Sequence, residues 1–147
     1  MRIRRFEQGS SMAWTAVFLI TVLSPLMLRV IDGARLLYIR GRLQTATDAA
    51  CEDAAWAAGD RPAYIDTGQT QFGNEGYVFE VAQNTFWNTL DENTRMAFTP
   101  GLSVSLDYGN NQILCSGMAQ VPVLINAIVS TPVVNVQVSA IAAIRFR

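Results

Sequence analysis

Residues Gly9–Ala58 read GSSMAWTAVFLITVLSPLMLRVIDGARLLYIRGRLQTATDAACEDAAWAA. The first part of this stretch, Ser10–Leu28, is uncharged and mostly apolar. A helix of that length rises by about 28 Å, which is close to the roughly 30 Å of hydrocarbon in a bilayer. The second part is amphipathic and rich in alanine. We therefore predict one long helix that crosses a membrane with its first half and forms a stem outside it with its second half.

The charges before the apolar run predict the orientation in the membrane. Arg2, Arg4 and Arg5 precede it, so the positive-inside rule places the N-terminus in the cytoplasm and the rest of the chain outside. Trp14, near the start of the run, suits the headgroup region. A cleaved secretory signal is the alternative, but the run lacks an A-x-A ending and continues directly into a helical pattern. We expect an uncleaved anchor in contact with the lipid of the inner or cytoplasmic membrane.

The stem carries a stripe of apolar and small residues at steps of three and four, as an amphipathic helix does. Its members are Leu36, Ile39, Leu43, Ala46, Ala50, Ala54 and Ala57. Such a stripe is usually the core beneath a sheet, and a contact face for another subunit is the alternative. Asp32 lies three residues from both Arg29 and Arg35. These charges form either an interfacial cluster that ends the membrane span or a pairing site for a neighbouring subunit.

A longer pattern in this region resembles a known family. Its residues are Gly9, Asp32, Arg35, Tyr38, Arg40, Arg42, Leu43, Gln44, Ala46, Asp48, Ala49 and Ala50. In this order and spacing they resemble the TadE/TadG-like proteins of tight-adherence (Flp) pilus systems, over about a third of the chain. The resemblance implies a structural protein, a membrane-anchored minor pilin or pseudopilin. It would assemble through its N-terminal helix into an extracellular filament or its base.

The resemblance also implies partners and roles for particular residues. The partners are copies of the chain or other pilins, and the pilus assembly machinery. The processing site would lie between Gly9 and Ser10, although Trp14 stands where many relatives carry a glutamate. The helix would pack against other subunits through Trp14, Phe18, Leu23, Asp32, Arg35, Leu36, Leu43 and Ala50.

The rest of the chain predicts a small head, so that the fold class is α+β. The boundaries are a basic N-terminus (1–9), a transmembrane and stem helix (10–58) and an extracytoplasmic head (59–147). A second helix is expected over Tyr77–Met96, with a core stripe of Phe79, Ala82, Phe86 and Leu90.

Alternation of apolar and polar residues predicts three antiparallel strands near 102–107, 113–121 and 132–147. A turn with positive φ is expected at Gly109–Asn111. No charge occurs from Tyr108 to Ile144, but prolines and the period of two argue against a second membrane helix there. The apolar segment Val123–Val129, or one face of the sheet, is instead expected to be covered by another protein.

The two cysteines, Cys51 on the stem and Cys115 in a strand, leave two alternatives. A disulfide would pin the sheet onto the stem, as suits an oxidising compartment. Two buried free thiols are the other interpretation, because cysteine is among the most buried residue types.

Nothing in the sequence indicates an active site. Histidine is absent, and so are a P-loop, a G-x-S-x-G motif and a paired-cysteine metal motif. Asp48, Glu52 and Asp53 are interpreted as a solvated helix face. We expect neither an enzyme nor a cofactor, and the net charge of −1 does not favour nucleic acid. A stationary membrane-anchored binding or scaffold module, using the polar loop Arg61–Gly76, is the second hypothesis, and a small anchored enzyme is the third.

Overall fold

The computed structural model describes residues 4–59, 65–66, 72–123 and 133–145, with side chains from Ser11 onward. The chain forms two compact units. One consists of Met1–Arg35 and Val123–Pro132, and the other, called the head below, consists of Leu36–Pro122 and Val133–Arg147. The head therefore begins at Leu36, so the predicted stem, which is the second half of the long helix, belongs to it.

The predicted long helix is present. It consists of α1 (Arg4–Phe18), a π-helical turn η1 (Leu19–Leu23) and α2 (Ser24–Ala58), which follow one another directly. The π-helical turn lies immediately before Pro25, whose ring would clash with the carbonyl four residues earlier in a regular helix. The stretch Ser11–Ala58 is long and apolar enough to cross a membrane.

The three predicted strands form one antiparallel sheet of order β1-β2-β3. They are β1 (Gly101–Asp107), β2 (Gln112–Pro122) and β3 (Val133–Ala143). The turn between β1 and β2 has its positive φ at Asn111, 52°, and the Asp107 carboxylate accepts hydrogen bonds from the turn. The long N-terminal helix, the further helices of the head and the antiparallel sheet together confirm the α+β class.

The prediction of a single helix over Tyr77–Met96 is wrong. The structure has α4 (Glu75–Thr89) and α5 (Glu92–Phe98), separated by Leu90 and Asp91, both in an extended conformation. Asp91 starts the second helix because its carboxylate accepts hydrogen bonds from the Thr94 amide and hydroxyl, 3.2 and 2.6 Å away. These bonds satisfy a backbone amide at the start of α5. A continuous helix would have no such free end at this point.

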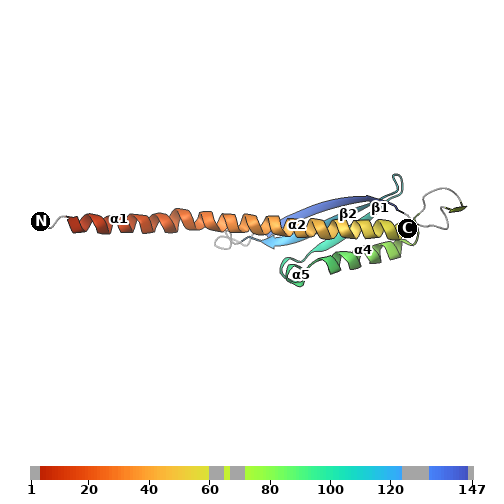
Figure 1. Ribbon diagram of the computed structural model, residues 1–147, viewed down its shortest axis with the longest axis horizontal. Coiled ribbons are helices and arrows are strands. Elements are labelled where there is room, and N and C mark those ends of the chain that lie inside the picture. Colours follow the sequence, from red (N-terminus) through yellow and green to blue (C-terminus); the bar gives the residue numbers. More distant parts are fainter. Residues whose placement is uncertain (1–3, 60–64, 67–71, 124–132, 146–147) are drawn as a thin grey trace. The chain divides into compact units, whose positions relative to one another are not determined.

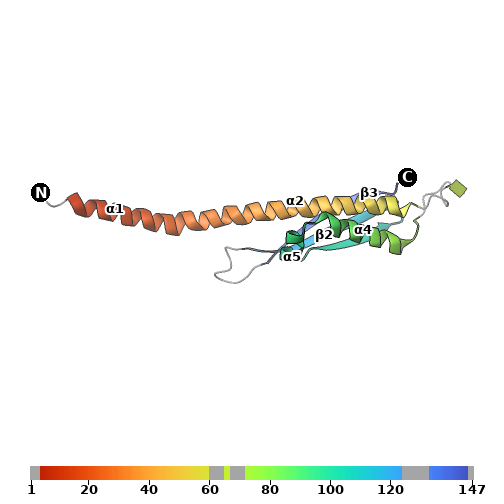
Figure 2. The same ribbon diagram turned by 60° about the horizontal axis from the view of Figure 1, so that its bottom comes forward.

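The core of the head lies between one face of the sheet and two helices. Figures 1 and 2 show α2 and α4 running along the strands. All the predicted inward residues of β2 are buried: Ile113, Cys115, Gly117, Ala119 and Val121. From α2 the core receives Ile39, Leu43, Ala46, Ala50 and Ala54, and from α4 it receives Val78, Ala82 and Phe86. Phe79 is 37% exposed, so its predicted place in the core is taken by Val78.

Helix α2 is also tied to the end of the chain. The Gln44 side chain donates to the Ser139 carbonyl at 3.3 Å, and the Arg145 amide donates to the Ala55 carbonyl at 3.2 Å. Beneath β2 the helix approaches very closely at Gly117. A Cβ there would overlap the Thr47 hydroxyl and lie 3.1 Å from Val138 and 3.3 Å from Leu43.

Acid is expected to weaken the head through two capping carboxylates. Hydrogen bonds from Thr94 hold the pKa of Asp91 below its ordinary value of 3.8, and those from Asn110 do the same for Asp107. Because the folded state favours both ionised forms, their contribution is complete above about pH 5 and is lost as the pH falls through 3.8 and below.

The measurement is the urea midpoint of the full chain in detergent from pH 6 to pH 2. Asp91→Asn keeps a capping oxygen that does not titrate, so its midpoint should fall less steeply below pH 4 than that of the wild type. An equally steep fall would show that Asp91 does not contribute to the acid sensitivity.

Candidate functional site

The first candidate surface is the apolar helix before the head. From Ser11 to Ile31 every residue except Leu28 is exposed. Trp14, Phe18 and Leu23, three of the predicted subunit-packing residues, are 74%, 56% and 37% exposed on it. Continuous apolar surface of this kind marks contact with lipid or with another protein.

Asp32, at the end of this surface, differs from its neighbours. It is only 6% exposed, whereas the preceding Ile31 is 48% exposed. Arg35 is half-buried. A simple exposed charge cluster therefore does not describe Asp32, because a buried carboxylate requires compensating polar partners.

The predicted packing surface has to be corrected in the stem. Leu43 and Ala50 are 1% and 0% exposed because the sheet and α4 of the same chain cover them. They cannot touch another subunit. They belong to the head's own core, as the first interpretation of the stripe predicted and its alternative, a subunit-contact face, did not. Leu36 is half-buried at the margin of this core.

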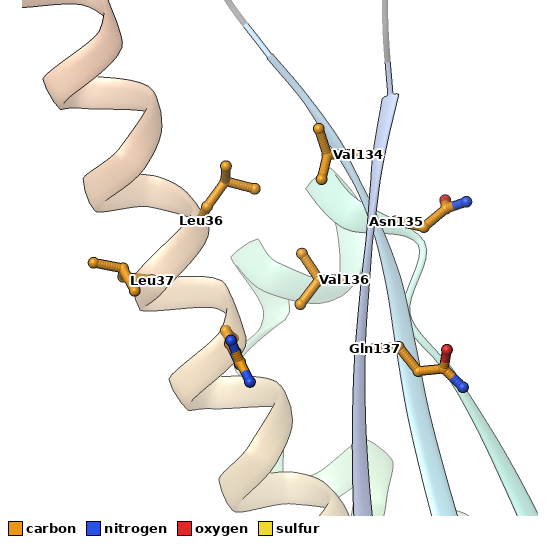
Figure 3. A pocket seen from close by; sticks show the side chains of 7 residues that line it. Leu36, Leu37, Val134, Asn135, Val136 and Gln137 are labelled. Carbon is orange, nitrogen blue, oxygen red and sulfur yellow. The ribbon is translucent and has the colours of Figure 1, made fainter.

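The second candidate surface is a groove of about 440 Å³ between α2 and β3. Leu36, Leu37 and Arg40 line it from the helix. Figure 3 shows Val134 and Val136 of β3 pointing toward the helix while Asn135 and Gln137 point away. The lining therefore combines apolar side chains with one cation, Arg40, and two amides.

Sequence reasoning missed this groove for a physical reason. The alternation in β3 placed Val134 in the core together with Val136, yet Val134 is 39% exposed and Val136 only 9%. Leu37 could have pointed to the groove. It lies outside the core stripe of the helix and is 72% exposed, so this leucine has no packing partner within that stripe.

The structure brings Cys51 and Cys115 together in the core. Both thiols are free, and they are 1% and 2% exposed. The Cys51 thiol donates to the Ile113 carbonyl at 3.4 Å. The hydrogen bond with Cys51, followed by burial, raises the pKa of the Cys115 thiol. A disulfide between them stays a prediction, which the mass of the non-reduced protein tests.

The acidic residues of α2 lie on its surface. Asp48, Glu52 and Asp53 are exposed. Glu52 forms an ion pair with Arg145 at 2.5 Å, and Asp53 accepts a hydrogen bond from Thr85 at 2.8 Å. In the described part of the chain, no group of three or more histidine, cysteine or acidic residues could hold a metal ion.

Three sequence predictions fall wholly or partly outside the described residues. Gly9 and Ser10 lie within α1, but their side chains are not described. Most of the polar loop Arg61–Gly76, and all of the segment Val123–Val129 except its first residue, lie outside the described residues.

The comparisons with known proteins add no family. No family model, curated protein or solved structure matches the chain. The function must therefore be inferred from the surfaces described above and from the resemblance carried by residues 9–50.

Proposed function

We propose that the chain is a membrane-anchored, pilin-like structural subunit of the TadE/TadG-like type. Its N-terminal helix would assemble beside equivalent helices into an extracellular filament or its base. The head would lie outside the cytoplasmic membrane. Neither an active site nor a cofactor is needed for this role.

One observation carries the proposal. A helix that exposes apolar side chains from Ser11 to Ile31 continues, without a loop, into the core of the head from Ile39 to Ala58. An independent anchor needs only to hold a domain at the membrane, and a loop between the two would suffice. A continuous helix instead provides one packing element that belongs to both the anchor and the head.

The mechanism is transfer of an apolar helix from lipid to a helix bundle. In the bilayer, lipid surrounds Trp14, Phe18 and Leu23. On assembly, the same side chains contact neighbouring helices, and van der Waals packing replaces the lipid contacts. A contact between two different faces of identical subunits does not close on itself, so it extends into a filament.

An aspartate in the apolar run should abolish anchoring and assembly. Ile20 is 72% exposed in the middle of that run. An acid near the centre of a membrane helix costs about 2.5 to 3.5 kcal/mol, so Ile20→Asp should reduce the membrane-bound fraction at least tenfold. The matched control is Met96→Asp, because Met96 is 80% exposed on the head and lies far along the chain from the apolar run.

The measurements are membrane fractionation, protease accessibility of the head, and mass spectrometry of sheared filaments and pilus-base complexes. We expect the wild type and Met96→Asp in both the membrane and the assembled fraction. If assembled fractions never contain the wild-type chain, the assembly role is refuted. The N-terminal residue of the mature chain reports processing, since a start at Ser10 indicates prepilin-type cleavage.

The groove of Figure 3 favours a second candidate function, a stationary anchored binding module. In that case the chain would remain in the membrane, with its head accessible to protease. A bulky substitution in the groove, Val134→Trp, would then remove ligand binding and leave the membrane fraction unchanged.

A further inference from the structure

Strand β3 forms one edge of the described sheet, so β2 pairs with only one of its two sides. That pairing runs through the whole strand, Val133–Ala143, without a bulge. The strand contains neither a charged residue nor a proline. Natural proteins protect an edge strand with charges, prolines, bulges or a covering element. Because β3 has none of the first three, its protection depends on what covers its free edge.

Helix α2 covers only one part of this edge. The Ile144 amide donates to the Asn111 carbonyl on the β2 side, at 3.1 Å, whereas the Arg145 amide donates to α2. The Ser139 carbonyl also accepts a hydrogen bond from α2, through the Gln44 side chain. In an antiparallel strand, successive residues direct their backbone groups alternately to the two sides. The odd-numbered residues of β3 therefore direct theirs to the free edge, and α2 contacts that edge from Ser139 onward.

The other part of the edge borders the groove of Figure 3. Asn135 and Gln137 share the direction of Ser139, so their backbone amides and carbonyls point to the free edge. No described residue forms a hydrogen bond with these backbone groups. Residues 134–137 of β3 all line the groove, although their side chains point to opposite faces of the sheet. The backbone edge is what these residues have in common on the groove side, and it is open to a ligand.

The spacing of these backbone groups matches an extended peptide. Residues two apart in a strand lie about 6.6 Å from each other, and an added strand presents complementary amides and carbonyls at the same interval. Alternate side chains of the added strand would contact the apolar part of the lining, which consists of Leu36, Leu37, Val134 and Val136. The edge therefore favours an extended backbone, and the lining favours apolar residues at every second position.

Arg40 determines the charge that suits the groove. It is the charged residue among the lining residues, and its side chain is exposed. Within the described part of the chain, Arg40 forms neither a hydrogen bond nor an ion pair. Arg42 differs, because its Nε donates to the Tyr38 hydroxyl at 3.2 Å. A carboxylate on the added strand would complement Arg40, whereas a basic side chain would be repelled.

We propose that the groove binds an extended segment of a partner protein, which joins the three-stranded sheet beside β3. The segment carries apolar residues at alternate positions and an acidic side chain that pairs with Arg40. This names the ligand class of the binding module described above. The site lies wholly in the head, so it applies to an assembled subunit as well as to a stationary module. Its failure would leave the predictions for Ile20→Asp unchanged.

Selection from a random peptide library displayed on phage tests the site, with the full chain in detergent as the target. The wild type should retain peptides that have alternating apolar residues and one acid. Arg40→Glu should retain peptides with a base in place of that acid. Failure of the wild type to select any peptide, or selection of the same acidic peptides by Arg40→Glu, overturns the proposal.

Two further variants locate the binding. Val134→Trp fills the groove, so it should weaken binding of a selected peptide at least tenfold. Ile141→Trp is the matched control, because Ile141 is 65% exposed on the same strand and is not part of the groove lining. It should bind the peptide as the wild type does. Equal binding by both variants would place the peptide elsewhere and overturn the proposal.

Hydrogen exchange of single amides separates strand addition from apolar binding alone. In the free chain, the Asn135 and Gln137 amides should exchange faster than the Val136 amide, which points to β2. The selected peptide should slow the two edge amides about tenfold or more and leave Val136 unchanged. Binding that does not slow them overturns strand addition. Slowing that requires no peptide and increases with protein concentration assigns the edge to a second copy, which overturns the partner segment.

Discussion

Gly117→Ala should destabilise the head by about 3 kcal/mol, the upper part of the range for an overpacked core. The added methyl group has no space, because it would overlap the Thr47 hydroxyl and lie 3.3 Å from Leu43 Cγ. Relief requires a shift of α2 away from β2, which would open the core on both sides of that point. Urea unfolding of the full chain in detergent, followed by near-UV circular dichroism, measures the change.

Two further variants make this prediction specific. Gly101→Ala is the matched control, because its Cβ would meet Met118 at an ordinary 3.6 Å. It should leave the stability unchanged or raise it by up to about 1 kcal/mol, because glycine in a strand with room is less favourable than alanine. Thr47→Ala should restore part of the stability of Gly117→Ala, with a coupling energy of about 1 kcal/mol. Strict additivity of the two substitutions would show that the close approach is not the cause.

Phe86→Ala should cost about 3 to 5 kcal/mol, as is usual for removal of a buried aromatic ring. Phe86 is 0% exposed, lies in the cluster that joins α2, α4 and the sheet, and makes an edge-to-face contact with Trp87 at 5.6 Å between ring centroids. Its removal leaves a cavity that the alanines of α2 are too short to fill. The same urea titration measures the loss.

Phe79→Ala is the matched comparison on the same helix. Phe79 is 37% exposed, so its replacement should cost less than about 1 kcal/mol. Equal losses for Phe79→Ala and Phe86→Ala would contradict the orientation of α4 in the structure.

The buried face of the sheet was predictable because alternation with a period of two leaves only two possible sets of inward-facing residues. Ile113 and Cys115 are buried, as their alternation with polar residues predicts. On α4 the inward-facing side was ambiguous, since both Val78 and Phe79 precede Ala82 at a helical step. The larger side chain, Phe79, was predicted to be in the core, but Val78 is the buried residue. The break at Asp91 had a local signal, because Asp91 and Thr94 form an N-cap pattern that interrupts an otherwise continuous stripe.

The candidate surfaces were predictable only in part. The apolar run Ser10–Leu28 is evident from composition, and its residues 11–27 are exposed in the structure. The burial of Thr47 in the core was not predicted, because a polar residue is not counted in a stripe of apolar residues. It is 0% exposed and satisfies its hydroxyl on the Leu43 carbonyl at 2.8 Å. The groove depends on the spacing between α2 and β3, which no pattern within either element specifies.

The pairing of Gln44 with Ser139 and of Ala55 with Arg145 has a consequence for biogenesis. Helix α2 is synthesised before β3, which covers it, so native contacts of the alanine face must wait until β3 has been made. Contacts of such long sequence separation form slowly, and a chain whose helix is still uncovered is prone to aggregate in the meantime. Truncation of the last dozen residues should therefore leave a chain that requires chaperones or is degraded, even though every helix and the first hairpin remain encoded.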